Sequence, residues 1–241
     1  MFDVPATVLH ALVGAGATLT LEYTGRSAIA SLGTRALRTV WSFLSEDTHV
    51  FVSLLRPLKE GAAIGFGDLL SISTIAEIKN RHFSRGGGLH VHTVASEFEK
   101  VKAENLVILG GGRHNSIYRD LVESLRVPLH FFDTATQSFS EIRNTDRSIV
   151  YTPTYDDAHV VQKDTGILVR ARNPLQSEKT VVIAAGSHSF GTGAAISYMA
   201  SREGISDLRK HASSNCEAVV QCHVVNGTIV DVTRISQVLK W

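Results

Sequence analysis

The residues best suited to chemistry lie between positions 186 and 193, where the sequence reads Gly-Ser-His-Ser-Phe-Gly-Thr-Gly. The preceding residues 180–185 are apolar and β-branched, as in a strand buried on both faces, and residues 194–200 are typical of a helix that begins where the glycines stop. A tight turn between a strand and a helix presents unpaired backbone N–H groups and the positive end of the helix dipole. An anion, most often a phosphate, suits such a turn. We therefore expect a ligand there, bound by Gly186, Ser187, Gly191, Thr192 and Gly193, with His188 and Ser189 as groups for chemistry.

A second turn of this kind follows the apolar run at residues 105–109. Its glycines, Gly110, Gly111 and Gly112, would let a ligand approach the backbone closely. Asn115 could cap the helix that follows or bond a ligand hydroxyl. Because both turns follow buried strands, we expect them to share a crevice at the carboxyl ends of those strands.

Two carboxyl groups stand where strands are expected to end. Asp68 opens a helical pattern at residues 69–80, where it would cap the helix, meet a ribose hydroxyl or act as a base. Asp133 follows a short strand expected at residues 128–132. Both are candidate catalytic residues.

The sequence Ser187-His188-Ser189-Phe190-Gly191 allows a further interpretation. It resembles the nucleophile elbow of α/β-hydrolases, a resemblance that implies Ser189 as nucleophile and the amides of residues 110–112 as an oxyanion hole. The order of the chain opposes this, because only about fifty residues remain for the acid and the histidine that should follow. The turn also lacks the Lys-Ser/Thr ending of a Walker motif and the spacing of a Gly-x-Gly-x-x-Gly turn, which disfavours ATP hydrolysis and standard dinucleotide redox chemistry.

The order of elements over residues 48–200, with glycine turns after two strands and an acid after the first strand, resembles a group of Rossmann-like domains. These are the SLOG, TIR and nucleoside deoxyribosyltransferase domains, which sense nucleotides or release their bases. The resemblance implies a nucleotide-derived ligand, bound by a sensor or effector domain. It also implies, as an alternative, cleavage or transfer of an N-glycosidic bond in a nucleoside or an NAD-like substrate, with Asp68 and Asp133 as the carboxylates by position.

The pattern as a whole predicts a three-layer α/β domain with a mostly parallel sheet. Short extended runs at residues 149–151, 159–162 and 166–170, separated by Asp-Asp and Asp-Thr-Gly turn chemistry, predict an antiparallel insertion. Asn226-Gly227 predicts a C-terminal hairpin with a type I′ turn. We expect this domain to cover residues 46–241, after a helical N-terminal segment at residues 1–45.

The N-terminal segment carries the pattern of a membrane-associated helix. Residues 4–21 contain no charge, and Arg26, Arg35 and Arg38 follow among apolar residues at helical spacing. Such a segment could lie on an anionic membrane surface, or form a helical hairpin over a core or an oligomer interface.

The two cysteines fit neither a disulfide framework nor a zinc motif, which favours a reducing compartment. We expect a cytoplasmic protein, with membrane association through residues 1–44 and homo-oligomers as alternatives.

Charge and histidine content limit the other partners. A net charge of +1 predicts no strong global field, and so gives no strong case for nucleic acid. His90 and His92 would project from one face of a strand, a spacing that metals can use, but no third ligand is evident. We expect partly buried strand histidines there and no metal. The sequence does not identify a cofactor.

Overall fold

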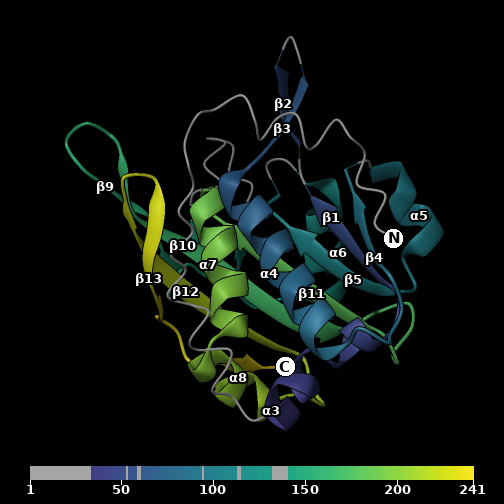
Figure 1. Ribbon diagram of the computed structural model, residues 1–241. Coiled ribbons are helices and arrows are strands. Elements are labelled where there is room, and N and C mark those ends of the chain that lie inside the picture. The colour runs from purple at the N-terminus through teal and green to yellow at the C-terminus, as the bar shows by residue number, and fades with distance from the viewer. Residues whose placement is uncertain (1–33, 53, 59–60, 94, 113–114, 132–140) are drawn as a thin grey trace.

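The computed structural model describes residues 34–52, 54–58, 61–93, 95–112, 115–131 and 141–241. The predicted uncharged run at residues 4–21 and the candidate Asp133 lie outside the described residues. Within the described part, a mixed sheet of nine strands forms the centre of the molecule, in the order β13-β12-β10-β11-β5-β1-β4, with β9 beside β10 and β14 beside β12 (Figure 1). These strands are β1 (Thr48–Val52), β4 (Leu89–His92), β5 (Asn105–Leu109), β9 (Thr154–Tyr155), β10 (Val161–Arg172), β11 (Thr180–Gly186), β12 (Cys216–Val225), β13 (Thr228–Arg234) and β14 (Leu239–Lys240).

The strands β4, β1, β5 and β11 are parallel neighbours and form the core of the sheet. The strands β10, β12 and β13 continue the sheet in antiparallel pairing. Successive side chains of a strand point to opposite faces, so β5 contributes Val107 and Leu109 to one apolar cluster and Leu106 and Ile108 to the other. Both faces are therefore buried, which explains the nearly continuous apolar sequence of β5 and β11.

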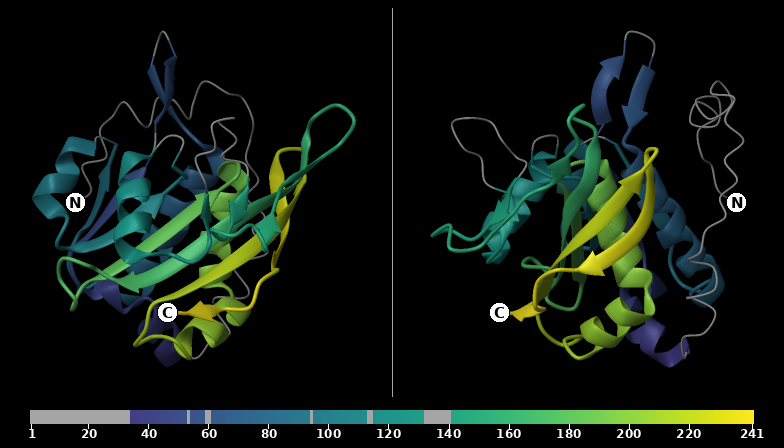
Figure 2. Two further views of the ribbon diagram at one scale, coloured as in Figure 1. Left: turned by 180° about the vertical axis from the view of Figure 1, so that it is seen from behind. Right: turned by 90° about the vertical axis from the view of Figure 1, so that its left-hand side faces the viewer.

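Helices cover both faces of this sheet (Figure 2). One face packs against α4 (Phe66–His82) and α7 (Ser189–Ala200), which contact each other along their lengths. The opposite face packs against α6 (Ser116–Leu125), whose buried side chains include Tyr118 and Leu121. Two further helices are short: α5 (Phe98–Val101), which follows the 3-10 turn η2 (Ala95–Glu97), and α8 (Arg202–Arg209).

The described chain begins with α3 (Thr34–Val40) and the 3-10 turn η1 (Ser42–Ser45). Their apolar side chains join the core, and Trp41 is completely buried, with its indole N–H donating to the carbonyl of Met199 at 3.3 Å. Arg35 and Arg38 are exposed. Among the described residues, no helix combines the length and the apolar character needed to cross a membrane.

Two small antiparallel sheets lie outside the main sheet. A hairpin of β2 (Leu54–Leu58) and β3 (Gly61–Ile64), which follows β1 and precedes α4 in the chain, projects from the top of the molecule in Figure 1. The second sheet contains β6 (His130–Phe131), β7 (Ile142–Arg143) and β8 (Val150–Tyr151). The strand expected at residues 128–132 is thus β6, and it pairs with β7 rather than with the parallel core.

Two expected boundaries need correction. The helix after β11 begins at Ser189, not at residue 194, because Gly191 and Gly193 lie inside α7 where neighbouring backbone passes close to them. Asp164, Thr165 and Gly166 do not form a turn but lie within the twelve-residue strand β10.

The predicted C-terminal hairpin is confirmed: Asn226 and Gly227 both have positive φ angles, of 51° and 73°, as a type I′ turn requires.

Candidate functional site

The two glycine turns lie side by side at one edge of the sheet. Strands β5 and β11 are parallel neighbours with Leu109 opposite Ala184, and the N–H of Gly110 donates to the carbonyl of Ala184 at 2.9 Å. A Cβ atom built on Gly111 would lie 3.6 Å from the carbonyl oxygen of Gly186. The turn at residues 110–112 therefore meets residues 186–193 at the carboxyl ends of two adjacent parallel strands. Residues 186–193 contain the end of β11 and the first turn of α7, and we keep the name 186–193 turn for them.

The glycines of the 186–193 turn are required by close packing. A Cβ atom on Gly191 would lie 2.2 Å from the carbonyl oxygen of Thr165 in β10, and one on Gly193 would lie 3.1 Å from the Cα of Gly67 in α4. A Cβ on Gly186 would meet the carbonyl oxygen of His188 at 2.2 Å. These glycines let α7 approach β10 and α4, so packing alone accounts for their presence.

A carboxylate from β10 caps α7. Asp164 is fully buried and accepts hydrogen bonds from the backbone N–H groups of His188 and Gly191. Its Oδ1 also accepts the N–H of Thr165 at 2.9 Å. Sequence reasoning missed this residue, since Asp-Thr-Gly is usual in turns. A negative side chain thus already occupies the helix N-terminus at which we expected a ligand anion.

The same carboxylate orients His188. Its Oδ1 lies 3.2 Å from Nδ1 of His188, and Nε2 on the other side of the ring lies 3.3 Å from the hydroxyl of Tyr155 in β9. The imidazole remains 35% exposed, whereas Asp164 is inaccessible. A buried carboxylate that fixes a half-exposed imidazole is an arrangement suited to proton transfer. Nearby, the hydroxyl groups of Ser187 and Thr165 lie 2.8 Å apart.

Ser189 and Asp68 lie on the other side of this turn, at the contact between α7 and α4. The Cβ of Ser189 is 2.9 Å from the position that a Cβ on Gly65 would take, and Asp68 lies beside the same glycine. The ring nitrogens of His188 instead contact Asp164 and Tyr155. Ser189 therefore faces α4, while the histidine ring faces β9 and β10.

Asp68 is an unusual carboxyl group. It is 95% buried, and burial raises its pKa to about 7, against the lowering effect of a hydrogen bond from the Thr192 side chain. Among the described residues, its Oδ1 has no hydrogen-bond partner. A neutral carboxyl group is therefore well populated at physiological pH, which is the state that a general acid needs.

Asn115 caps α6. Its side-chain oxygen accepts the N–H of Ile117 at 3.1 Å, and its amide donates to the carbonyl of Leu109 at 3.1 Å. The first turn of α6 contains Ser116, Ile117 and Tyr118, so this helix begins without an acidic residue. The three helices that follow parallel strands thus differ: α4 and α7 have a carboxyl group at the N-terminus, and α6 has a neutral amide.

The described residues define an α/β protein whose mixed sheet has a parallel core, with two glycine turns and several polar side chains at one edge. In the described part of the chain, no group of three or more His, Cys, Asp and Glu side chains is arranged to hold a metal ion. No protein-family model matches the chain, and no curated protein matches it as a relative.

Proposed function

We propose that the protein binds a nucleotide or another phosphorylated small molecule at the 110–112 turn and the N-terminus of α6, beside the 186–193 turn. In this proposal the domain is Rossmann-like and acts as a sensor or effector. The chain runs from β1 to β4 on one side and then to β5 on the other, and a reversal of this kind marks the usual ligand position in an open α/β sheet.

The observation that carries the proposal is the difference between neighbouring helix ends. Asp164 supplies a negative charge to the N-terminus of α7, and Asp68 supplies a carboxyl group to that of α4. The N-terminus of α6 has only Asn115, so its dipole favours an external anion. The adjacent glycines would let a phosphate approach the backbone.

Isothermal titration of the full chain against a panel of nucleotides and inorganic phosphate tests this site. Gly111→Ala is the informative variant, because its Cβ would meet its neighbours only at ordinary contact distance and the fold should persist. Gly191→Val is unsuitable, since a Cβ there would overlap the backbone of Thr165. Gly227→Ala, in the β12–β13 turn, is the control: it strains a residue of positive φ, and so shows whether destabilisation away from the site alters binding.

We expect Gly111→Ala to weaken ligand binding by about tenfold or more, since one misplaced methyl group costs about 1–3 kcal/mol in a close contact. Gly227→Ala should bind as the wild type does. Equal binding by the wild type and Gly111→Ala, or no binding by the wild type, would rule out this site.

Asp68 supports a second candidate, cleavage or transfer of an N-glycosidic bond in a nucleoside or NAD-like substrate. A neutral carboxyl group could protonate the departing base, and water or another acceptor would then take the sugar. Chromatography should detect slow release of free base or nicotinamide, abolished in Asp68→Asn. Asp120→Asn, an exposed change on α6, should leave the release unchanged.

Each of three further predictions has its own test. Labelling of Ser189 by a fluorophosphonate would support serine hydrolase chemistry. Liposome flotation that depends on residues 1–44 would support membrane association. Sedimentation across a range of concentrations would detect the predicted homo-oligomers.

A further inference from the structure

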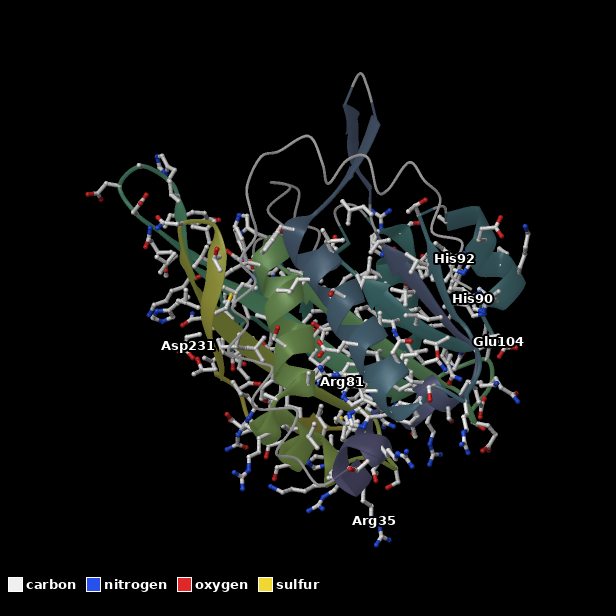
Figure 3. The ribbon with its side chains drawn as sticks, in the orientation of Figure 1. Arg35, Arg81, His90, His92, Glu104 and Asp231 are labelled. Atoms are coloured by element: carbon white, nitrogen blue, oxygen red, sulfur yellow. The ribbon has the colours of Figure 1, made fainter. Side chains whose placement is uncertain are left out.

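The described chain begins at a face of the molecule that is rich in arginine. Arg35 and Arg38 lie on the exposed side of α3, because the apolar side of this helix, with Leu37 and Val40, packs into the core. Figure 3 shows Arg35 directed away from the lower end of the molecule, with Arg81 of α4 above it. The apolar side of α3 is therefore not available to a membrane, and its polar side faces outward.

A distant segment of the chain brings further positive charge to α3. Burial, and then the positive charges of Arg38 and Arg81, lower the pKa of His82 at the C-terminal end of α4. The side chains of these three residues are therefore close together. Arg85 follows in the turn after α4, and this turn is hydrogen-bonded to the end of η1.

Helix α8 adds two more arginines. It packs against α3, and Arg202 and Arg209 are its first and last residues, about two turns apart, so they lie on the same side of the helix. The carboxylates of α8, Glu203 and Asp207, lie within 4.0 Å of Arg234. They are thus engaged with another cation rather than with the two arginines.

We call the exposed arginines of these three segments the basic face: Arg35, Arg38, Arg85, Arg202 and Arg209. Among the described residues, none of them forms an ion pair. Arg81 is not included because it pairs with Glu77 at 2.8 Å. The C-terminal ends of α3, α4 and α8 each contribute about half a unit of negative charge. These helix ends offset part of the charge of the arginines, and the face remains positive.

We propose that the basic face binds an anionic lipid surface. Anionic lipids attract clusters of about four to eight Lys and Arg that lie beside a membrane-associated segment. Residues 4–21, which carry no charge, and Arg26 precede α3 in the chain, so the basic face lies where this run joins the domain. The net charge of only +1 opposes nucleic acid as the partner, because it gives no attraction beyond the face itself.

Binding through the basic face would orient the domain on the bilayer. Helix α4 connects this face to the candidate ligand edge: its first turn contains Asp68, its last turn contains His82, and its 17 residues span about 25 Å. The 110–112 turn and the N-terminus of α7 would then face away from the lipid, where a dissolved ligand can reach them. The proposal does not depend on which ligand binds there.

Binding of the full chain to two kinds of vesicle tests the proposal. One kind contains phosphatidylserine and phosphatidylcholine in equal parts, and the other contains phosphatidylcholine alone. Two double variants each remove two charges from the basic face: Arg38→Gln with Arg85→Gln, and Arg202→Gln with Arg209→Gln. The charge-matched control is Arg119→Gln with Arg147→Gln, at exposed positions on α6 and between β7 and β8.

We expect the wild type to bind the anionic vesicles more tightly than the neutral ones, and raised salt to reduce the difference. Each double variant of the basic face should lower the affinity for anionic vesicles by about 25-fold, since each Lys or Arg near the surface contributes about fivefold. The control should lower it by less than about threefold, because its charges lie farther than a Debye length from the lipid. Thermal melts by circular dichroism check folding, and the two variants on different elements keep the test valid if one does not fold.

Orientation provides a second measurement, which does not depend on how residues 1–33 bind. A dye on Ser206→Cys, between Arg202 and Arg209, should transfer energy to an acceptor in the lipid headgroups more efficiently than a dye on Asp120→Cys in α6. Both positions are exposed, whereas Cys216 and Cys222 are buried, so the introduced thiol is the one labelled.

Equal affinity of the wild type for the two kinds of vesicle, with equal energy transfer from the two dyes, would overturn the proposal. So would double variants of the basic face that lose no more affinity than the control. Binding of the basic face to duplex DNA, with no preference for anionic vesicles, would assign it to nucleic acid instead.

Discussion

Asp164 and His188 are joined both through the main chain and through their side chains. The carboxylate accepts the backbone N–H of His188 at 3.2 Å, and its Oδ1 lies 3.2 Å from the ring Nδ1. One buried acid thereby fixes the residue before α7, satisfies amides of the first helical turn and sets the direction of an exposed imidazole. Local structure and potential chemistry depend on the same side chain.

Asp164→Asn should therefore destabilise the protein. The amide that replaces one carboxylate oxygen cannot accept a hydrogen bond, so one of the buried N–H groups loses its partner, at a cost of about 1.5–3 kcal/mol. Asp156→Asn is the matched control, because Asp156 accepts the N–H groups of Ala158 and Val160 in an exposed turn, and it should cost below about 1 kcal/mol. Urea unfolding of both variants measures the difference, and equal midpoints would contradict this account.

Gly67→Ala should destabilise the protein although alanine normally favours a helix by about 0.5–1 kcal/mol. A Cβ on Gly67 would lie 1.6 Å from the carbonyl oxygen of Ser189, so α4 and α7 would have to separate. We expect a cost of about 1–3 kcal/mol or more. Gly111→Ala, with its nearest neighbours at 3.6 Å, should change stability by less than about 1 kcal/mol. A Gly67→Ala variant as stable as Gly111→Ala would show that the two helices can separate at little cost.

Trp41→Ala should cost about 3–5 kcal/mol, because this completely buried side chain joins residues 34–45 to the core and to α7. Trp241, the other tryptophan, is only partly buried, and Trp241→Ala should cost less. The same packing predicts that a chain starting at residue 46 will be unstable. Circular dichroism with urea tests both statements, and a stably folded chain of residues 46–241 would support the sequence-based boundary instead.

Local patterns predicted what depends on local sequence. The strand Asn105–Leu109 was predicted with its observed bounds, since an apolar run with a following glycine suffices to define it. The start of α7 was wrong because Gly191 and Gly193 suggest a turn, while the reason for them is close contact with Thr165 and Gly67. Asp164 and Gly191 are 27 positions apart, and only the pairing of β10 with β11 brings them together.

For the candidate site, too, the sequence predicted what depends on local pattern and missed what depends on contacts between distant elements. The sequence placed both glycine turns after buried strands, and the neighbouring positions of β5 and β11 bring those turns together. The sequence did not indicate that α7 already has a carboxylate at its N-terminus or that Asp68 is buried at the contact with α7. Both facts depend on which elements are neighbours in space.

The stability of the protein should fall between about pH 5 and pH 8 because of Glu217. This residue is completely buried on β12, where its carboxyl oxygens accept the N–H of Leu129, and burial raises its pKa from 4.5 to about 8. Over this interval the folded state holds a proton that the unfolded state has released, so unfolding becomes easier as pH rises, by up to about 1.4 kcal/mol per pH unit.

Glu217→Gln keeps an acceptor for Leu129 and cannot ionise. We expect it to match the wild type near pH 5 and to exceed it near pH 8, whereas the exposed change Glu123→Gln should follow the wild type throughout. Burial also raises the pKa of Asp68, to about 7, so this residue too makes the stability fall as pH rises, over a lower pH range. The free energies of unfolding are therefore compared as differences between variants. If Glu217→Gln and the wild type run parallel from pH 5 to pH 8, Glu217 is ionised in the folded protein and burial does not control its charge.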